Sequence, residues 1–314
     1  MNIRKFVKNN AIWLVFVAMV IIFTIASKGV FLRPTNLVAV GRQVAVYGIA
    51  AVGMTFVILI AGIDLSTGSI ITLVNIICAY FMVNAGMNMW VAVSLSVAIA
   101  TLVGLLNGFM VSKIGIPALI ATFASQTIFE GAAYLISGGI PISGFTKDFD
   151  LFGKSAIGIV PVSVIIMIIC LAVGSFILNK SYFGRYFYAI GGNEDAAELS
   201  GIRVNRVKYL IYSLSGFFAG IAGIVMLSRT GSAQGTAGKG YEFDVITCVV
   251  LGGVSVNGGV GRISGVIAGV LIIGSLTNGM ILMDVSTYMQ MVVKGIVLAI
   301  AVGVDCISKK RQAA

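Results

Sequence analysis

Residues 89–112 read MWVAVSLSVAIATLVGLLNGFMVS, and this stretch is long and apolar enough to cross a lipid bilayer as one helix. Runs of the same kind recur along the chain. Of its 314 residues, 59% are apolar and 10% are charged, and the mean hydropathy is +1.06. Such a composition cannot form the surface of a water-soluble protein. The sequence therefore predicts an all-α fold, a polytopic transmembrane helix bundle.

We expect about ten spans, because ten segments of about 20 residues consume roughly 200 positions and leave no room for a folded extramembrane domain. The apolar run after MNIRKFVKNN is interpreted as the first span and not as a cleaved signal, since many more apolar runs follow. The whole chain, 1–314, is then one transmembrane domain. The other spans are expected near residues 40–61, 68–84, 89–112, 118–136, 157–178, 207–228, 241–257, 261–282 and 287–306.

The basic residues divide unevenly between the two sides of this bundle, and Lys294 falls inside a span. The side that holds both termini carries Arg4, Lys5, Lys8, Lys113, Lys180, Arg185, Arg203, Arg206, Lys208, Arg262, Lys309, Lys310 and Arg311. The other side carries Lys28, Arg33, Arg42, Lys147, Lys154, Arg229 and Lys239. Because Lys and Arg gather on the cytoplasmic side of membrane proteins, both termini are expected in the cytoplasm. The same rule explains the net charge of +10 without a nucleic acid partner.

Several kinds of chemistry are absent from the sequence. The chain has no histidine, which removes histidine metal sites, Ser-His-Asp and Cys-His nucleophiles. The four cysteines are far apart and are expected to be free packing thiols. The segment GTAGKG at 235–240 resembles the end of a phosphate-binding loop. Ala233 stands where that loop has its first glycine, and Gly240 stands where it has a Ser or Thr. We expect no catalytic residue, no metal site, no cofactor and no ATP binding.

Two segments interrupt the apolar pattern in a similar way, VILIAGIDLSTGSI at 57–70 and VVLGGVSVNGGVGRI at 249–263. They are either broken helices at matching positions beside a transport pathway, or tight turns between helices. Glycines spaced four residues apart predict close helix packing, at Gly104 and Gly108, at Gly216 and Gly220, and at Gly261, Gly265 and Gly269.

The most informative polar stretch is NKSYFGRYFYAIGGNEDAAELSGIRVNRVK, residues 179–208, on the side of the termini. Asn193 can cap a short helix, Glu194 and Asp195 place negative charge in its first turn, and Gly201 supplies a left-handed stop. A helix this short does not persist alone in water. It packs either on its own bundle or on a partner subunit.

Four motifs, in order, give the chain a strong resemblance to a known family. GIDLSTGS, GRYFYAIGGNEDAAELSGIRV, GYEFDVITCVVLGGVSVNGGVGRISG and MVVKGIVLAIAV resemble the permease subunit of bacterial ribose-type ABC sugar importers. The resemblance implies a homodimeric or pseudo-dimeric pore in the bacterial inner membrane, a cytoplasmic ABC ATPase and an extracytoplasmic sugar-binding protein. It also implies that the loop near 179–206 couples the permease to the ATPase. The coupling residues are then Gly192, Asn193, Glu194, Asp195, Ala196, Ala197, Glu198, Leu199 and Gly201.

Within this coupling helix, Ala196, Ala197 and Leu199 are expected to offer a small apolar surface to a groove on the ATPase, with acidic residues around it. The chain departs from the family at Glu130, where relatives often carry a basic residue. A pair between Glu130 and Lys294, the other charge inside a span, is one arrangement that the sequence allows.

A sugar is neutral and rich in hydroxyl groups, so its path needs replaceable hydrogen-bond partners. Polar residues on or beside the spans are candidates, although each is as often a bond between helices. They are Asp64, Ser66, Asn75, Asn107, Gln126, Thr127, Glu130, Asn278 and Gln290.

The function predicted from these features is the permease of an ATP-driven importer of a monosaccharide, ribose or a similar sugar, energised by a separate ATPase. The alternative is an ion-coupled secondary transporter, which would need an ion site at mid-membrane, and Glu130 and Asp64 are the residues available for it. A membrane enzyme is remote, because the spans lack histidine and clustered acids.

Overall fold

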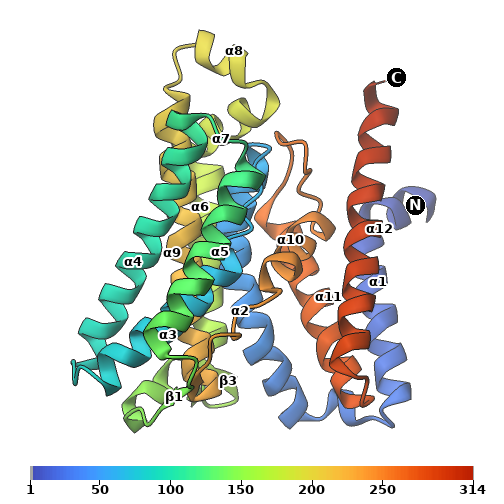
Figure 1. Cartoon of the computed structure of the whole chain (residues 1–314). Coiled ribbons are helices and arrows are strands. Elements are labelled where there is room, and N and C mark those ends of the chain that lie inside the picture. Colours follow the sequence, from blue (N-terminus) through green and yellow to red (C-terminus); the bar gives the residue numbers. More distant parts are fainter. Residues whose placement is uncertain (1–2, 314) are drawn as a thin grey trace.

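The computed structural model describes residues 3–313, with side chains from residue 12 to residue 307, and this part of the chain is mainly helical (Figure 1). The α-helices are α1 (Ile3–Ala26), α2 (Pro34–Leu59), α3 (Thr67–Val83), α4 (Met89–Phe109), α5 (Ala118–Ser137), α6 (Val162–Lys180), α7 (Tyr182–Gly192), α8 (Glu194–Leu199), α9 (Val204–Thr230), α10 (Tyr241–Leu251), α11 (Ile263–Leu282) and α12 (Thr287–Ala313). A π-helical turn, η2 (Met110–Ile114), extends α4, and 3-10 turns lie at η1 (Val30–Leu32) and η3 (Lys147–Leu151).

Four two-residue strands complete the part of the chain that the structure describes. β1 (Ile142–Ser143) pairs antiparallel with β4 (Ser232–Ala233), with Ile142 opposite Ala233. β2 (Ala156–Ile157) pairs antiparallel with β3 (Val160–Pro161). All four lie at the end of the bundle opposite α8, where they order the loops between α5 and α6 and after α9 (Figure 1).

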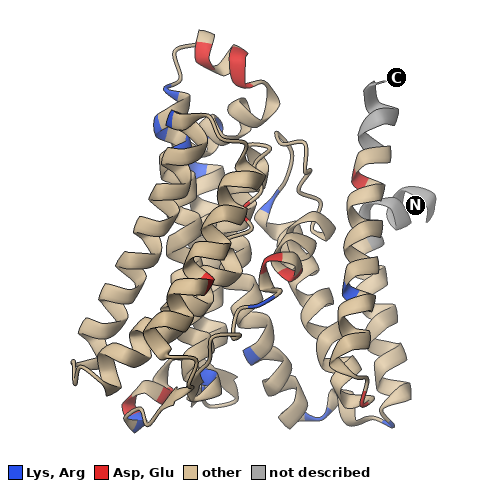
Figure 2. Cartoon of the chain, in the orientation of Figure 1, with Lys and Arg blue, Asp and Glu red and all other residues tan. Residues whose placement is uncertain are grey.

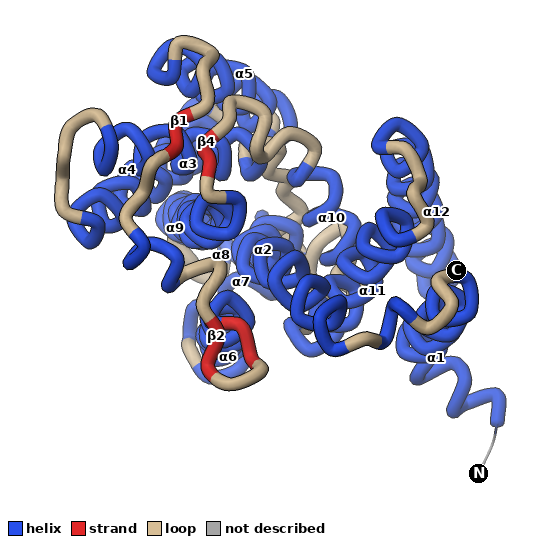
Figure 3. Tube along the Cα trace, turned by 90° about the horizontal axis from the view of Figure 1, so that it is seen from below, coloured by secondary structure: helices blue, strands red, loops and turns tan. Residues whose placement is uncertain are grey.

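The core of the bundle is built around α2 and α9. Within the most apolar stretch of each helix, 89% of α2 and 72% of α9 is buried in the chain, against 6% of α12. Figure 3 shows α2 and α9 in the middle of the bundle, with α1 and α12 at one side. Helices α2 and α9 therefore face protein on most sides. Helix α12 leaves most of its surface for lipid or for another chain.

The glycine spacing works as predicted where α4 crosses α9. A Cβ added to Gly104 would lie 2.1 Å from the carbonyl oxygen of Tyr212, and one added to Gly216 would lie 2.3 Å from that of Ala100. The two backbones touch, which is how small residues stabilise helix pairs in a membrane.

Among the described residues, seven helices are long and apolar enough to span a membrane, namely α2, α4 with its π turn, α5, α6, α9, α11 and α12. Two apolar helices are shorter, Ile12–Ala26 within α1 and Thr67–Val83. The expected span 241–257 is not formed as predicted, because its helix, α10, ends at Leu251. Gly253 follows with a left-handed φ of +81°. Eleven residues rise about 16 Å, roughly half of the hydrocarbon thickness. The count of ten spans stays a prediction.

The amino end of α1 and the carboxyl end of α12 point to the side on which α7 and α8 lie (Figure 1). Figure 2 shows basic residues gathered at the end of α9 next to α8, with further ones at the opposite end of the bundle. The basic residues closest to the termini lie outside the described side chains; they are Arg4, Lys5, Lys8, Lys309, Lys310 and Arg311.

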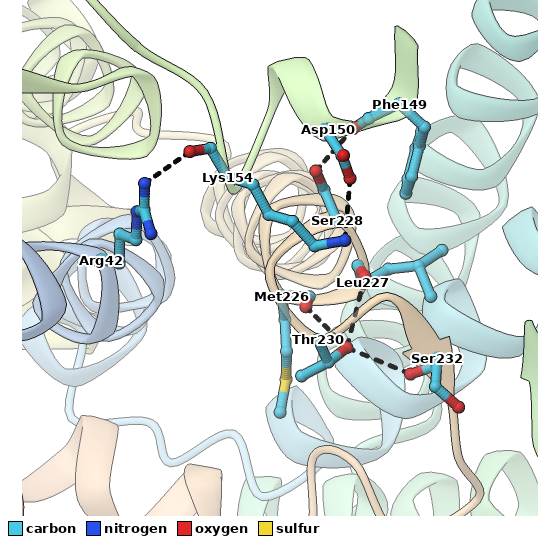
Figure 4. A network of polar contacts seen from close by, with 9 residues as sticks. All are labelled: Arg42, Phe149, Asp150, Lys154, Met226, Leu227, Ser228, Thr230 and Ser232. Atoms are coloured by element: carbon cyan, nitrogen blue, oxygen red, sulfur yellow. Dashed lines mark hydrogen bonds and ion pairs between the residues drawn. The ribbon is translucent and has the colours of Figure 1, made fainter. Parts of the chain in front are cut away.

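The end of the bundle away from α8 is closed by a network of polar contacts around the last turn of α9 (Figure 4). Ser228 donates from its buried hydroxyl to the carbonyl oxygen of Phe149, and Lys154 forms an ion pair of 2.9 Å with Asp150. Arg42 of α2 donates to the carbonyl oxygen of Lys154. The loop between α5 and α6 is thereby fixed to both core helices.

The cysteines are unpaired, as expected: Cys78, Cys170 and Cys248 are buried thiols and Cys306 is half-buried. No group of three or more His, Cys, Asp or Glu in the described part of the chain is arranged to hold a metal ion.

Candidate functional site

Helix α8 is capped at both ends as the sequence predicts. Asn193 has an extended backbone, and its Oδ1 accepts a hydrogen bond of 2.9 Å from the Ala196 N–H. Glu194 and Asp195 occupy the first turn. Gly201 follows the helix with a φ of +86°, a conformation that favours glycine. The local signals are sufficient to define this element.

The surface that α8 offers differs from the expected one. Ala197 is buried, with 4% of its surface exposed, so it packs on its own chain and cannot enter a groove on a partner. Leu199 is 90% exposed, and Ala196 and Glu198 are also exposed. Glu194 forms an ion pair of 2.6 Å with Lys208 of α9. The helix is therefore anchored to the bundle by one face and presents Leu199 among acidic residues on the other.

A groove of about 270 Å³ lies beside α8. It combines apolar and aromatic side chains with two arginines, and it is lined by Phe183, Tyr186, Gly201, Ile202, Arg203, Arg206 and Val207.

The two interruptions of the apolar pattern meet each other beneath α7. The N–H of Gly259 donates to the carbonyl oxygen of Leu59 at 2.9 Å, so the loop after α10 is bonded to the end of α2. Gly191, near the end of α7, lies against the same carbonyl, where an added Cβ would come within 1.7 Å of the oxygen. The hydroxyl of Tyr188 donates to Gly261 at 2.8 Å. The first interruption is a turn between α2 and α3, and the second follows the half-length helix α10.

A cavity of about 690 Å³ lies between α2, α10, α11 and α12. Pockets of this size hold small molecules and orient them through a few polar groups. The polar and aromatic residues of the lining are Gln43, Tyr47, Thr236, Lys239, Tyr241, Phe243, Asp244, Thr247, Thr277, Thr287, Gln290 and Lys294.

A second cavity, of about 330 Å³, lies toward α3 and α5. It shares Lys239, Gly240, Phe243 and Met291 with the first, so the two cavities flank the amino end of α10. The other polar residues in its lining are Ser69, Thr72, Gln126, Glu130 and Glu242, and the Gln126 amide donates to Glu242 at 3.1 Å.

An ion pair lies at the edge of the larger cavity. Lys294 of α12 lies 2.7 Å from Oδ2 of Asp244 on α10, and the hydroxyl of Tyr47 donates to the same oxygen at 3.1 Å. The partner of Lys294 is therefore Asp244 and not Glu130. Asp244, Glu242 and Tyr47 are functional candidates that were not predicted from the sequence. The signal that could have found the two acids is their position at the amino end of an apolar helix, where the helix dipole favours negative charge.

Three of the predicted pathway residues, Gln126, Glu130 and Gln290, line these cavities. Asp64, Ser66 and Asn107 do not, because they form a closed buried network. Asp64 accepts from the backbone and hydroxyl of Ser66 and from Ser215 at 2.7 Å, Asn107 donates to Ser66 at 2.8 Å, and Ser125 donates to Asn107. Each of these side chains is at most 2% exposed.

The remaining candidates bond to helices. The Asn75 amide donates to the carbonyl oxygen of Gly223 at 2.9 Å, which joins α3 to α9. Asn278 exchanges two hydrogen bonds with Asn36, of 2.9 and 3.0 Å. Thr127 donates to Phe123 in its own helix. The bonds of Asn75 and Asn278 join two helices, which is the alternative that the sequence left open, and the bond of Thr127 stays within α5.

Comparison with known proteins adds to this geometry. Residues 36–302 match the family described as branched-chain amino acid transport system / permease component. The chain is 43% identical to the ribose import permease protein RbsC of Haemophilus influenzae, over 92% of this chain and 91% of that protein. It is 46% identical to the protein of the same name from Bacillus subtilis, over 91% of this chain and 89% of that one. It is 38% identical to the L-arabinose transport system permease protein AraH of Escherichia coli, over 88% and 84%. No solved structure matches the chain.

Proposed function

The chain belongs to the family of branched-chain amino acid transport system permease components, and we propose from this that it is the membrane permease of an ATP-driven importer for ribose or a similar monosaccharide. The observation that carries the proposal is the similarity to ribose import permeases over about nine-tenths of both chains. The chain is a multi-pass transport subunit and not an enzyme. A separate ABC ATPase supplies the energy.

The two cavities around α10 support a neutral, hydroxyl-rich substrate. Threonine hydroxyls and the amides of Gln43, Gln126 and Gln290 line them, and such groups both donate and accept hydrogen bonds. Each can exchange one partner for another as a sugar passes. The charges of Lys294 and Asp244 neutralise each other, so this part of the lining does not select for an ion.

Helix α8 is the element that we assign to the ATPase. It is ordered, it is anchored to α9 through Lys208, and it exposes Leu199 on the side where both termini point. A small apolar contact surrounded by charges suits an interface between two subunits that rearranges in every transport cycle. Closure of the ATPase then shifts the permease between inward-facing and outward-facing states.

The proposal also orients the chain in the bacterial inner membrane. The termini and α8 are cytoplasmic, and the end that carries η3, β2 and β3 faces the sugar-binding protein. A second permease copy or a paralogue completes the pore. An impermeant maleimide applied to intact cells should label Ile159→Cys, which replaces an 87% exposed side chain, and should miss Asp195→Cys. The reverse labelling pattern would overturn the orientation.

Uptake by the reconstituted transporter tests the function. The permease is placed in liposomes with its ATPase and binding protein, and radiolabelled ribose, xylose, arabinose and leucine are supplied with ATP. Uptake of a pentose, but not of leucine, is expected only with an active ATPase. Leucine uptake would assign the chain to amino acid import, and uptake driven by a proton or sodium gradient without ATP would assign it to secondary transport.

A further inference from the structure

We propose that Asp244 and Lys294 form a subsite that recognises two adjacent hydroxyl groups of the sugar as it crosses the membrane. The inference rests on the proposed function, because it assigns a substrate contact to the cavity between α2, α10, α11 and α12. Both side chains line that cavity, and both are largely buried, with 9% and 21% of the respective side chains exposed.

The pair has unused hydrogen-bonding capacity on both members. Lys294 and Tyr47 both donate to Oδ2 of Asp244, and Oδ1 accepts no hydrogen bond from the described part of the chain. The Lys294 ammonium carries three N–H donors, and one of them is used for Asp244. An acceptor and two donors therefore remain side by side at the edge of the cavity.

This combination matches a vicinal diol. One hydroxyl can donate to Oδ1 of Asp244 while the neighbouring hydroxyl accepts from Nζ of Lys294, so the sugar bridges the ion pair without breaking it. Hydrogen bonds to charged groups are stronger than bonds between neutral groups, which favours this position over the surrounding threonines and glutamines. Because the opposite charges of the pair cancel, the subsite does not attract ions.

Two tyrosines provide the apolar part of the subsite. The rings of Tyr47 and Tyr241 lie with their centroids 5.1 Å apart, and both residues line the cavity. The Lys294 ammonium lies 5.9 Å from the centre of the Tyr47 ring, which keeps it beside the aromatic wall. A sugar has apolar C–H faces as well as hydroxyl edges, and the rings offer a surface for those faces.

The ion pair could instead have a purely structural role and hold α10 against α12, and this role predicts a different effect of substitutions. Substitutions would then lower the stability of the permease, but binding of ligands would not depend on the placement of their hydroxyl groups. The two roles are separated by a binding measurement that varies the ligand as well as the protein.

Saturation-transfer NMR on the full permease in lipid nanodiscs provides that measurement, since it detects weak ligands without the binding protein. D-ribose should receive saturation from the wild-type protein. Asp244→Asn and Lys294→Gln should weaken binding about tenfold or more, and Lys294→Arg, which keeps the charge and the donors, should retain most of the signal. The matched controls Asp150→Asn and Lys154→Gln alter an ion pair at the far end of the bundle and should leave the ribose signal unchanged.

Competition on the wild-type protein tests the subsite even if the variants fold poorly. Cyclohexane-1,2-diol should displace ribose, and cyclohexane-1,3-diol, which has the same atoms with separated hydroxyls, should not. Equal competition by the two diols, no saturation transfer to ribose, or unchanged binding in Asp244→Asn and Lys294→Gln would each overturn the inference. If the wild-type transporter nevertheless imports a pentose with ATP, the proposed function stands without this subsite. If it imports none, the proposed function itself fails.

Discussion

Leu199 gives the most direct test of the coupling assignment. It is a large apolar side chain, 90% exposed, and it is the last residue of α8. This helix lies at the end of the bundle toward which both termini point. If α8 docks on the ATPase, Leu199 loses this exposure in the complex. Leu199→Ser should then weaken the complex while leaving the permease folded, because a substitution at an exposed position changes the free energy of unfolding by no more than about 0.5 kcal/mol.

The size of the effect follows from the exposed surface. Complete burial of a leucine side chain is worth about 1.5–3 kcal/mol, and nearly all of the Leu199 side chain is available for burial. Since about 1.4 kcal/mol corresponds to a factor of ten, Leu199→Ser should raise the Kd of the ATPase about 10-fold to 150-fold. Sugar uptake at limiting ATPase should fall in the same proportion.

The assay is titration of purified ATPase onto permease in nanodiscs, followed by uptake per folded permease in liposomes. Ile159→Ser is the matched control, because Ile159 is another large apolar side chain, 87% exposed, in the turn between β2 and β3. These strands lie at the end of the bundle opposite α8. It should not alter ATPase binding. Wild-type affinity and wild-type uptake in Leu199→Ser would refute the assignment of α8.

Gly191→Ala should lower the melting temperature and the uptake, because its Cβ would lie 1.7 Å from the Leu59 carbonyl oxygen and overpacking costs about 1–3 kcal/mol. An alanine Cβ at the neighbouring Gly192 meets nothing within 4 Å, so Gly192→Ala should keep the wild-type melting temperature; an equal loss of melting temperature in the two variants would contradict the packing argument. Gly201→Val places a β-branched residue at a φ of +86°, at a cost of about 1–2 kcal/mol, and should reduce the sugar moved per ATP hydrolysed; an unchanged ratio would contradict a coupling role for this stop. The purified chain, freed of its ATPase, should bind no radiolabelled ATP, because segment 235–240 lacks the residues of a phosphate-binding loop; saturable binding would count against this.

Features encoded by neighbouring residues were predictable from the sequence. The cap of α8 depends on Asn193 and on the N–H of Ala196, three positions away, and its stop depends on one glycine. Some long apolar helices also begin and end within two residues of their expected bounds, as α5 does at Ala118–Ser137 for an expected 118–136. Others differ more: α2 begins at Pro34 for an expected 40, and α6 begins at Val162 for an expected 157. In each case the deciding interactions are local in the chain.

Features that depend on distant residues were not predictable in this way. Asp64 stands out in an apolar run and was therefore assigned to the pathway, but Ser215, on another helix, closes its hydrogen bonds. Asp244 and Lys294 are 50 positions apart, and no spacing rule pairs them. Ala197 belongs to a six-residue helix, which is too short for its sequence to indicate the buried face.

The packing beneath α7 connects α8 to the cavity by two short routes. Leu59 ends α2, and Tyr47 stands twelve residues earlier on the same helix, about 18 Å along its axis. The loop that carries Gly259 is bonded to Leu59 and is continuous with α10, which carries Asp244. Because packed backbones resist compression, a displacement of α7 toward this contact moves α2, the loop after α10, or both. Tyr47 and Asp244 are hydrogen-bonded across the cavity wall, so unequal movement of the two helices changes the distance between them at the place where we locate the sugar.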